Sequence, residues 1–173
     1  MFEKLETERL YLTPIAINDI EKIESMHSDP RVMAYAGDGK PMSETENWRF
    51  CAQLMGHWHI RGYGMYSLYL KKNNSFCGLC GLHYPPMYPG PEIGWRLAYD
   101  CWSNGYAIEA ANVVQDFAFN TLMLDKVYHF IEPDNKRSIR LAHKLGAQRI
   151  DQAYLPVIDE SLQDYLIFVT ENS

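Results

Sequence analysis

The sequence predicts a single α/β domain that spans residues 1–173. Two observations support this fold class. Segments in which apolar and polar residues alternate, as in strands, are interspersed with segments of helical period. No repeat, linker or low-complexity tract separates them. A chain of 173 residues, 47% hydrophobic and 22% charged, is also long enough to bury a core without disulfides or metal.

The first elements are predicted by an alternating segment and two helix-start signals. Residues 9–14 alternate and stop at a proline, which is typical of a strand. Asn18 with Glu21, and Ser43 with Glu46, have the spacing of capping boxes, so a helix is expected to begin at each. The face of the second helix that we expect to be buried carries Trp48, Ala52 and Met55.

The middle of the chain predicts a hairpin followed by a stiff loop. Residues 63–71 and 76–84 read as two strands, and Lys72-Asn73-Asn74-Ser75 between them as their turn. Residues 85–91 (PPMYPGP) cannot enter a sheet, because each proline lacks a backbone donor. This segment is therefore expected to be a loop.

The second half predicts two helices among four strands. The strands are expected at residues 92–98, 126–131, 147–151 and 163–170. The first helix, over residues 105–122, carries an apolar stripe of Ala107, Ala110, Ala111, Val114, Phe117 and Ala118. The second helix, over residues 136–145, follows a Pro133-Asp134-Asn135 turn and ends at Gly146.

Charge and cysteine usage exclude several classes of function. Sixteen basic against twenty-two acidic residues give a net charge of −6, which argues against a general nucleic-acid-binding surface. No segment has the composition of a signal peptide or a membrane helix. The pair Cys77 and Cys80 has no second pair at ligand spacing, and the six histidines are scattered, so no metal site is expected. A cytoplasmic protein with reduced cysteines is the prediction.

The most informative segment for chemistry is Trp102-Ser103-Asn104-Gly105-Tyr106-Ala107, which joins a strand to the longest predicted helix. Ser103 or Asn104 could cap that helix, and Gly105 permits close backbone approach. Unpaired amides at a helix start favour a bound anion. Considered alone, the segment is better explained as an ordinary helix start after a turn, because short glycine motifs match by chance.

Residues 102–107 have the form Q/R-x-x-G-x-G/A, with Trp102 in the first position. Further motifs lie around it in order: residues 6–12 (ETERLYL), 92–97 (EIGWRL), 133–138 (PDNKRS) and 144–146 (KLG). This ordered set resembles the GCN5-related N-acetyltransferase (GNAT) family, in particular its RimJ/RimL branch. The resemblance covers roughly residues 5–150.

The resemblance implies a central mixed, mostly antiparallel twisted sheet with helices on both faces. The sheet would be splayed between residues 92–97 and 126–131 to admit acetyl-CoA. By the same resemblance, the pantetheine arm would pair with the backbone of Arg96, Leu97 and Ala98. The pyrophosphate would lie on the loop of Trp102, Ser103, Asn104, Gly105, Tyr106 and Ala107. The group expected to contact the pantetheine arm and the 3′-phosphate comprises Asn135, Lys136, Arg137 and Ser138.

The reaction implied is direct transfer of acetyl from acetyl-CoA to a primary amine in a ternary complex. Glu92 is the candidate base, and a backbone N–H near Leu97 or Ala98 would stabilise the developing oxyanion. Many relatives use a tyrosine as acid on the helix after the Asn135 turn. Here that position holds Ala142, so Ser138 is the candidate donor to the leaving sulfur.

The acceptor is expected to be a protein N-terminus or a small-molecule amine. Residues near the proline-rich loop are candidates for its pocket: His83, Tyr84, Met87 and Tyr88. A monomer or a homodimer fits the sequence. The absent tyrosine keeps a second interpretation open, a non-catalytic acyl-CoA-binding or regulatory domain of the same fold.

Overall fold

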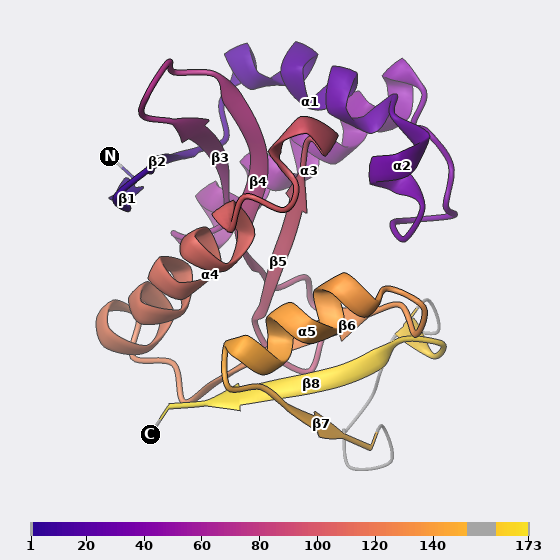
Figure 1. Cartoon of the computed structure of the whole chain (residues 1–173). Helices are drawn as coiled ribbons and strands as arrows, with labels where there is room; N and C mark the ends of the chain where they lie inside the picture. Colours follow the sequence, from indigo (N-terminus) through magenta and orange to yellow (C-terminus); the bar gives the residue numbers. More distant parts are fainter. Residues whose placement is uncertain (1, 152–161, 173) are drawn as a thin grey trace.

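The computed structural model describes residues 2–151 and 162–172, which build an eight-stranded sheet in the order β1-β2-β3-β4-β5-β6-β8-β7 (Figure 1). Its strands are β1 (Leu5–Glu6), β2 (Leu10–Pro14), β3 (Met65–Leu70), β4 (Phe76–His83), β5 (Glu92–Leu97), β6 (Lys126–Ile131), β7 (Gln148–Ile150) and β8 (Leu166–Glu171). Every neighbouring pair is antiparallel except β5 and β6. The predicted mixed, mostly antiparallel sheet is confirmed.

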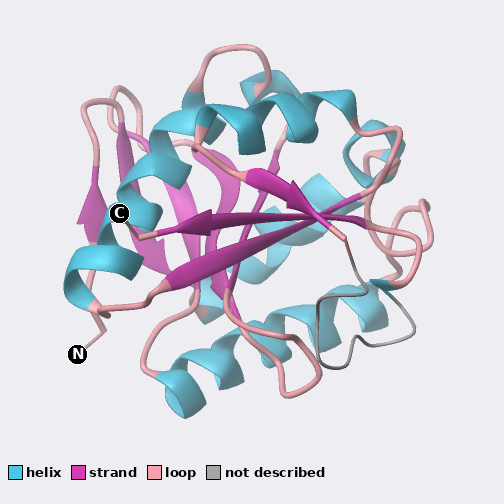
Figure 2. Ribbon diagram, turned by 90° about the horizontal axis from the view of Figure 1, so that it is seen from below, coloured by secondary structure: helices cyan, strands magenta, loops and turns pink. Residues whose placement is uncertain are grey.

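Helices cover both faces of the sheet (Figures 1 and 2). They are α1 (Ile20–His27), α2 (Pro30–Met33), α3 (Glu44–Arg61), α4 (Tyr106–Asp116) and α5 (Lys136–Lys144). Helix α4 packs on β4 and β5, and α5 on β6, in front of the sheet in Figure 1; α3 lies behind it, with α1 packed on α3. Two 3₁₀ turns, Ile17–Asp19 and Tyr99–Cys101, complete the connections.

The sheet opens between β5 and β6. Strand β5 pairs with β4 along its whole length, from Glu92 to Leu97, but with β6 only at Glu92 and Tyr128. Because the two strands are parallel and separate after this single pair, the rest of the β6-facing edge of β5 has no partner strand. The splay expected from the resemblance is therefore present, and it begins at Glu92.

Spacing predicts the buried stripe of α4 correctly and that of α3 wrongly. On α4 the expected alanine-rich stripe is buried from Ala110 onward, with Ala107 half-buried, and the helix continues into a π-helical turn, Phe117–Thr121. On α3 the expected face is wrong, because the Trp48 side chain is 60% exposed. The stripe that faces the sheet is shifted by one position and comprises Asn47, Cys51, Leu54 and Trp58. The Trp58 indole fixes this rotation by donating to the Met65 carbonyl at 2.8 Å.

One predicted capping box is present and the other is not. Ser43 Oγ accepts from the Glu46 N–H at 3.3 Å, and Glu46 accepts in return from the Ser43 N–H at 2.8 Å. The Asn18 box is wrong, because the chain already turns at Ile17–Asp19 and the buried Asp19 carboxylate accepts from the Ala16 N–H at 2.9 Å. Asp19 also accepts from Ser67, so tertiary contacts decide where this helix begins.

The cysteines are structural. Cys51, Cys77, Cys80 and Cys101 are all buried and free. Burial raises the pKa of the Cys51 thiol to about 11, so it stays protonated at neutral pH.

Candidate active site

The loop before α4 is fixed by hydrogen bonds to the end of β5. The Trp102 indole donates to the Leu97 carbonyl at 2.9 Å, and the Asn104 amide donates to the Trp102 carbonyl at 2.8 Å. Ser103 (φ +61°) and Gly105 (φ +80°) are both left-handed. The N-cap of α4 is Gly105, and no side chain caps the helix, so the expectation that Ser103 or Asn104 would do so is wrong.

The missing cap leaves the first-turn amides of α4 without side-chain acceptors among the described residues. Backbone N–H groups next to left-handed residues form concave donor sites that suit anions. The Asn104 side-chain amide donates within the loop and does not cap the helix. This geometry is what a phosphate-binding loop needs.

A cation from α5 reaches the same loop. The Arg137 guanidinium lies 4.7 Å from the centre of the Trp102 ring. Asn135 caps α5 by accepting from the Ser138 N–H at 3.1 Å, which fixes the helix start. Lys136 turns away, because its ammonium donates to the Pro133 carbonyl at 2.6 Å. Arg137 and the loop amides together fit the charge and donor pattern of a pyrophosphate or phosphate group.

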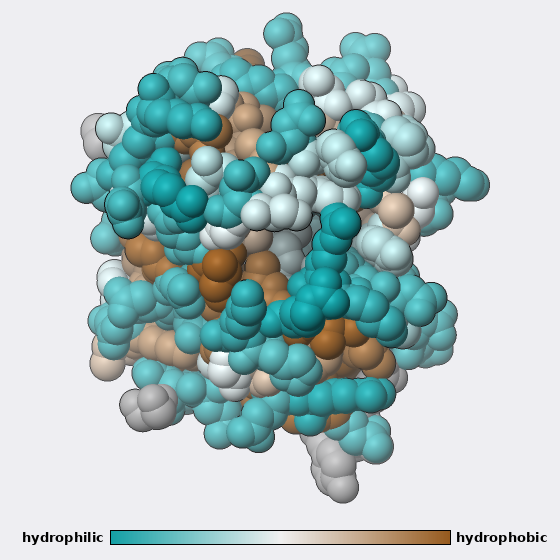
Figure 3. Space-filling model, viewed as in Figure 1, coloured by the Kyte–Doolittle hydropathy of each residue, from teal (hydrophilic) through white to brown (hydrophobic). Residues whose placement is uncertain are grey.

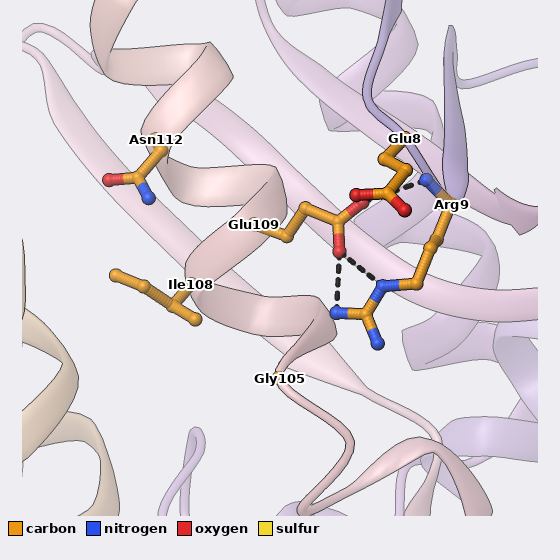
Figure 4. A pocket seen from close by; sticks show the side chains of 6 residues that line it. All are labelled: Glu8, Arg9, Gly105, Ile108, Glu109 and Asn112. Carbon is orange, nitrogen blue, oxygen red and sulfur yellow. Dashed lines mark hydrogen bonds and ion pairs between the residues drawn. The ribbon is translucent and has the colours of Figure 1, made fainter.

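The N-terminal motif, residues 6–12, contacts both this loop and α4. The sequence alone did not suggest this role. Arg9 Nε donates to Glu109 Oε2 on α4 at 2.6 Å (Figure 4), and Arg9 Nη1 donates to the Asn104 carbonyl at 3.0 Å. The Thr7 hydroxyl donates to the same Glu109 carboxylate. A hollow of about 570 Å³ beside these residues is rimmed by the carboxylates of Glu8 and Glu109, which makes it a poor phosphate site.

Only some of the backbone groups expected to hold the pantetheine arm lie on the free edge of β5. The Ala98 N–H donates to the Cys77 carbonyl at 2.9 Å, so by the alternation of a strand Ala98 and Arg96 direct their backbone N–H groups to β4. Trp95 and Leu97 therefore direct theirs into the splay. The Ala98 amide is already donated and cannot serve as an oxyanion donor, which leaves Leu97 of the two expected donors.

Across the splay, the Trp95 indole donates to Ser138 Oγ at 3.1 Å. The Ser138 hydroxyl accepts this bond and keeps its own proton for another acceptor. Ala142, one turn further along α5, is fully buried and packs in a cluster with Ile131 and Phe168. In this chain that position faces the sheet and has no room for a tyrosine. Figure 3 shows apolar side chains in a band between the upper and lower parts of this face.

Glu92 lies where the splay begins, with its side chain on the sheet face opposite to Trp95. A Cβ atom built at Gly94 would lie 3.8 Å from Glu92 Oε1, so the carboxylate leans over this glycine. Burial raises the pKa of Glu92 to about 7, against the opposing effects of the Phe130 N–H and of Arg96. A carboxyl group with this pKa can accept a proton at neutral pH.

Arg96 follows on the same face and is held by a buried relay that sequence reasoning missed. Its Nη1 lies 3.0 Å from His27 Nε2, and His27 Nδ1 lies 2.9 Å from Asn47 Oδ1. His27 and Asn47 are fully buried. Burial and the Arg96 charge lower the pKa of His27 to about 4, so it is neutral and accepts from Arg96. The scattered histidine positions gave no signal of this arrangement.

The four residues expected to line the acceptor pocket separate into two pairs. The His83 ring lies 5.6 Å from that of Tyr88, and His83 is the register partner of Glu92. Tyr84 instead stacks under the Arg61 guanidinium, 4.3 Å from its ring centre, and Met87 is 53% exposed on the loop. The structure brings His83 beside Glu92 and Tyr88 against His83, whereas Tyr84 and Met87 lie apart from this pair.

Residues 9–148 match the family model described as an acetyltransferase (GNAT) domain. The chain belongs to the GNAT acetyltransferase family. It is 30% identical over 149 residues to the N-acetyltransferase p20 of Bacillus licheniformis, covering 85% of this chain and 83% of that protein. The acetyltransferase structure from Agrobacterium tumefaciens superimposes with a TM-score of 0.87 at 28% identity, covering 99% and 96% of the two chains.

The RimJ/RimL likeness is also present at the level of fold. The ribosomal-protein-S5-alanine acetyltransferase from Vibrio fischeri has a TM-score of 0.73 at 17% identity, covering 99% of this chain and 97% of that one. Among the described residues of this GNAT chain, no helix is long and apolar enough to cross a bilayer. The same residues contain no group of three His, Cys, Asp or Glu side chains that could hold a metal ion.

The left-handed Gly105 gives a direct test of the loop. In Gly105→Val, a side chain at φ +80° is strained by about 1–2 kcal/mol, and its Cβ would meet Arg9 Nη2 at 3.4 Å. We expect the loop amides to reorient and acetyl-CoA affinity, measured by calorimetry, to fall at least about tenfold. Gly62→Val is the matched control, since Gly62 (φ +78°) ends α3 and a Cβ there has open space. Equal affinities for the two variants would contradict the assignment.

Proposed function

We propose that this protein, as one domain over residues 1–173, is an acetyl-CoA-dependent N-acetyltransferase that acts on a primary amine. The observation that carries the proposal is Glu92, a carboxyl group with a pKa near 7 placed where β5 leaves β6. A protein N-terminus or a small-molecule amine would be the acceptor. The relative named N-acetyltransferase supports the class of reaction.

Acetyl-CoA would supply the activated acetyl thioester. The loop amides from Asn104 to Ala107, with Arg137, would hold its phosphates, as their unpaired donors and charge suggest. The Leu97 N–H and the Trp95 backbone would orient the arm along the free edge of β5. The other expected cofactor residues would shape the loop and the start of α5 without contacting acetyl-CoA through a charged group; they are Ser103, Tyr106, Asn135 and Lys136. The described contacts give none of them a free charged group aimed into the splay.

The proton steps would fall to two side chains. Glu92 would take a proton from the acceptor ammonium, directly or through a water, so that the neutral amine attacks. Ser138, on the other side of the splay, would donate its hydroxyl proton toward the leaving sulfur. The Trp95 N–H also faces the splay and lies two positions closer to Glu92 than the Leu97 N–H does. It would therefore stabilise the charge that develops on the carbonyl oxygen, and the Leu97 N–H and the Trp95 carbonyl would hold the arm. His83 and Tyr88 would border the acceptor.

A non-catalytic acyl-CoA-binding domain is the second candidate. The observation that favours it is Ala142, which is buried at the position where many relatives have a tyrosine as acid. Thiol release from acetyl-CoA, measured with a panel of amines and N-terminal peptides, separates the two functions. Release with any acceptor supports the enzyme. Calorimetric binding of acetyl-CoA without release would support the binding domain, and absence of binding would contradict both.

Ser138 can be tested against a purely structural role. Ser138→Ala removes the proton donor and leaves the Trp95 indole without its acceptor, whereas Trp95→Phe removes only the indole donor. We expect kcat to fall about tenfold in Ser138→Ala and to be restored in Ser138→Thr. If the hydroxyl matters only as the partner of Trp95, then Ser138→Ala and Trp95→Phe will lower kcat equally.

A further inference from the structure

The face of β5 that carries Glu92 forms a strip with opposite charges at its ends. Glu92, Gly94 and Arg96 share this face because strand side chains alternate. The carboxylate lies at one end and the guanidinium at the other, and each affects the pKa of the other without forming an ion pair among the described residues. Each charged residue lies two positions along the strand from Gly94, so the centre of the strip has no side chain.

Glycines form the floor between the charges. Gly94 of β5 is the register partner of Gly81 of β4. A Cβ at Gly81 would collide with the Gly64 carbonyl at 2.4 Å, so this position cannot carry a side chain. A Cβ at Gly94 would have no contact closer than 3.8 Å. Among the residues that the structure describes, only the Glu92 carboxylate comes within 4 Å of that point, so a ligand chain over Gly94 would lie beside this carboxylate.

The acidic end of the strip also holds a ring nitrogen without a hydrogen-bond partner among the described residues. His83, opposite Glu92 in the register, has a buried Nε2 with no hydrogen-bond partner among the described residues. His83 is neutral near pH 7, since burial lowers its pKa to about 4. Cross-strand neighbours have Cβ atoms about 5 Å apart. A carboxylate and a neutral imidazole at this spacing suit a group that carries several N–H donors, such as an amine.

The basic end is built to present a guanidinium. Arg96 is oriented by the relay through His27 to Asn47. The Asn47 Nδ2 donates to the Ile20 carbonyl at 3.3 Å, so Oδ1 is the Asn47 atom that faces His27. The neutral His27 accepts a hydrogen bond from one N–H of Arg96 and does not neutralise its charge. Arg96 is half-buried as a residue, and burial lowers the pKa of its guanidinium to about 10. An anion that bound here would compensate a charge that the described residues leave without an ion pair.

We propose that the acceptor of this enzyme is an amine that also carries an anionic group, with its amine at Glu92 and His83, its chain over Gly94 and its anion on Arg96. The inference rests on the proposed function. Cα atoms four residues apart on a strand are about 13 Å apart, and the two long side chains shorten this span. The amine and the anion are therefore separated by several bonds, as in an ω-amino acid, an amino phosphate or a peptide with an acidic residue after its N-terminus.

The test compares acceptors in matched pairs, with thiol release as the readout. The pairs are 4-aminobutyrate and its amide, O-phosphoethanolamine and ethanolamine, and a hexapeptide with Asp and Glu at positions 2 and 3 against the same peptide with Asn and Gln. We expect kcat/KM to be at least about tenfold higher for the anionic member of one or more pairs. The pair with the largest ratio identifies the source of the anion.

Two variants locate the effect. Arg96→Gln is expected to lower kcat/KM for the anionic member to the level of its neutral partner, through KM. Thermal unfolding monitors whether this variant is folded. Gly94→Ala, which introduces no contact closer than 3.8 Å, is expected to raise KM for both members while the acetyl-CoA Kd stays constant. Retention of the full ratio in Arg96→Gln would overturn the proposal.

Failure of the inference can be told apart from failure of the proposed function. Transfer that shows no preference for anionic members overturns the inference alone. If no acceptor releases thiol, calorimetry with 4-aminobutyrate and O-phosphoethanolamine on the CoA-bound protein decides. Binding that Arg96→Gln abolishes supports the acceptor site without turnover, and absence of binding overturns both proposals.

Discussion

Glu92→Gln is expected to lower kcat by about 10²- to 10³-fold, because a positioned general base contributes this much to proton transfer. The amide keeps the size of the carboxyl group and cannot accept a proton from an ammonium. Acetyl-CoA affinity should stay within about twofold of the wild-type value, because the Glu92 side chain points away from the loop that would bind phosphate. A tenfold loss of affinity would correspond to about 1.4 kcal/mol. Single-turnover kinetics and calorimetry measure the two quantities.

The pH profile gives this prediction a second readout. The pKa of Glu92 is raised to about 7, so the basic form grows as pH rises through 7. The kcat of the wild-type protein should therefore increase between pH 6 and pH 8, and Glu92→Gln should lose this inflection. Glu171→Gln, at the exposed end of β8, is the control and should keep it. An unchanged profile in Glu92→Gln would remove Glu92 as the base.

The free energy of unfolding is expected to fall steeply in mild acid. Three histidines have folded-state pKa values lowered to about 4 by burial, namely His27, His83 and His129. Their ordinary pKa is 6.5, so between pH 6.5 and 4 the unfolded chain binds protons that the folded chain does not. Their contribution is fully present above pH 6.5 and is lost as pH falls toward 4. Each is worth about 2–3 kcal/mol over this window.

Glu92 acts in the opposite direction. Its folded-state pKa is raised to about 7 from 4.5, so the folded chain binds the extra proton between these values and gains about 3 kcal/mol as pH falls. The net loss between pH 7 and pH 4.5 is therefore about 3–5 kcal/mol, a large part of the stability of an ordinary domain. Urea unfolding at pH 7.5, 6, 5 and 4.5 measures it.

Variants assign this loss to the buried groups. His27→Gln should flatten the dependence of unfolding free energy on pH, and Glu92→Gln should steepen it by removing the opposing group. His143→Gln changes an exposed side chain and should leave the slope as it is. A wild-type unfolding free energy that is constant from pH 7 to pH 5 would contradict the burial of neutral histidines at these positions.

Local rules in the sequence determined the elements and the order of the motifs. Alternation predicted β2 to β6, helical period predicted the buried stripe of α4, and Ser43 with Glu46 predicted the start of α3. The motif around Gly105 predicted a helix start at this position, because glycine and the strand-to-helix spacing are properties of a few adjacent residues. The cap expected from Ser103 or Asn104 is absent. The ordered motifs were sufficient to predict the family.

Only the tertiary structure decided which side chains meet. Asp19, held by Ser67, moved the start of the first helix away from the Asn18 box, and the Trp58 hydrogen bond set the rotation of α3. The relay from Asn47 through His27 to Arg96 joins α3, α1 and β5, residues separated by 20 and 69 positions. Contacts between residues so far apart depend on how the elements pack, which no local pattern encodes. The sequence therefore determined the family and the position of the loop that we propose for the cofactor, and the packing of helices on β5 decided which side chains surround Glu92 and Arg96.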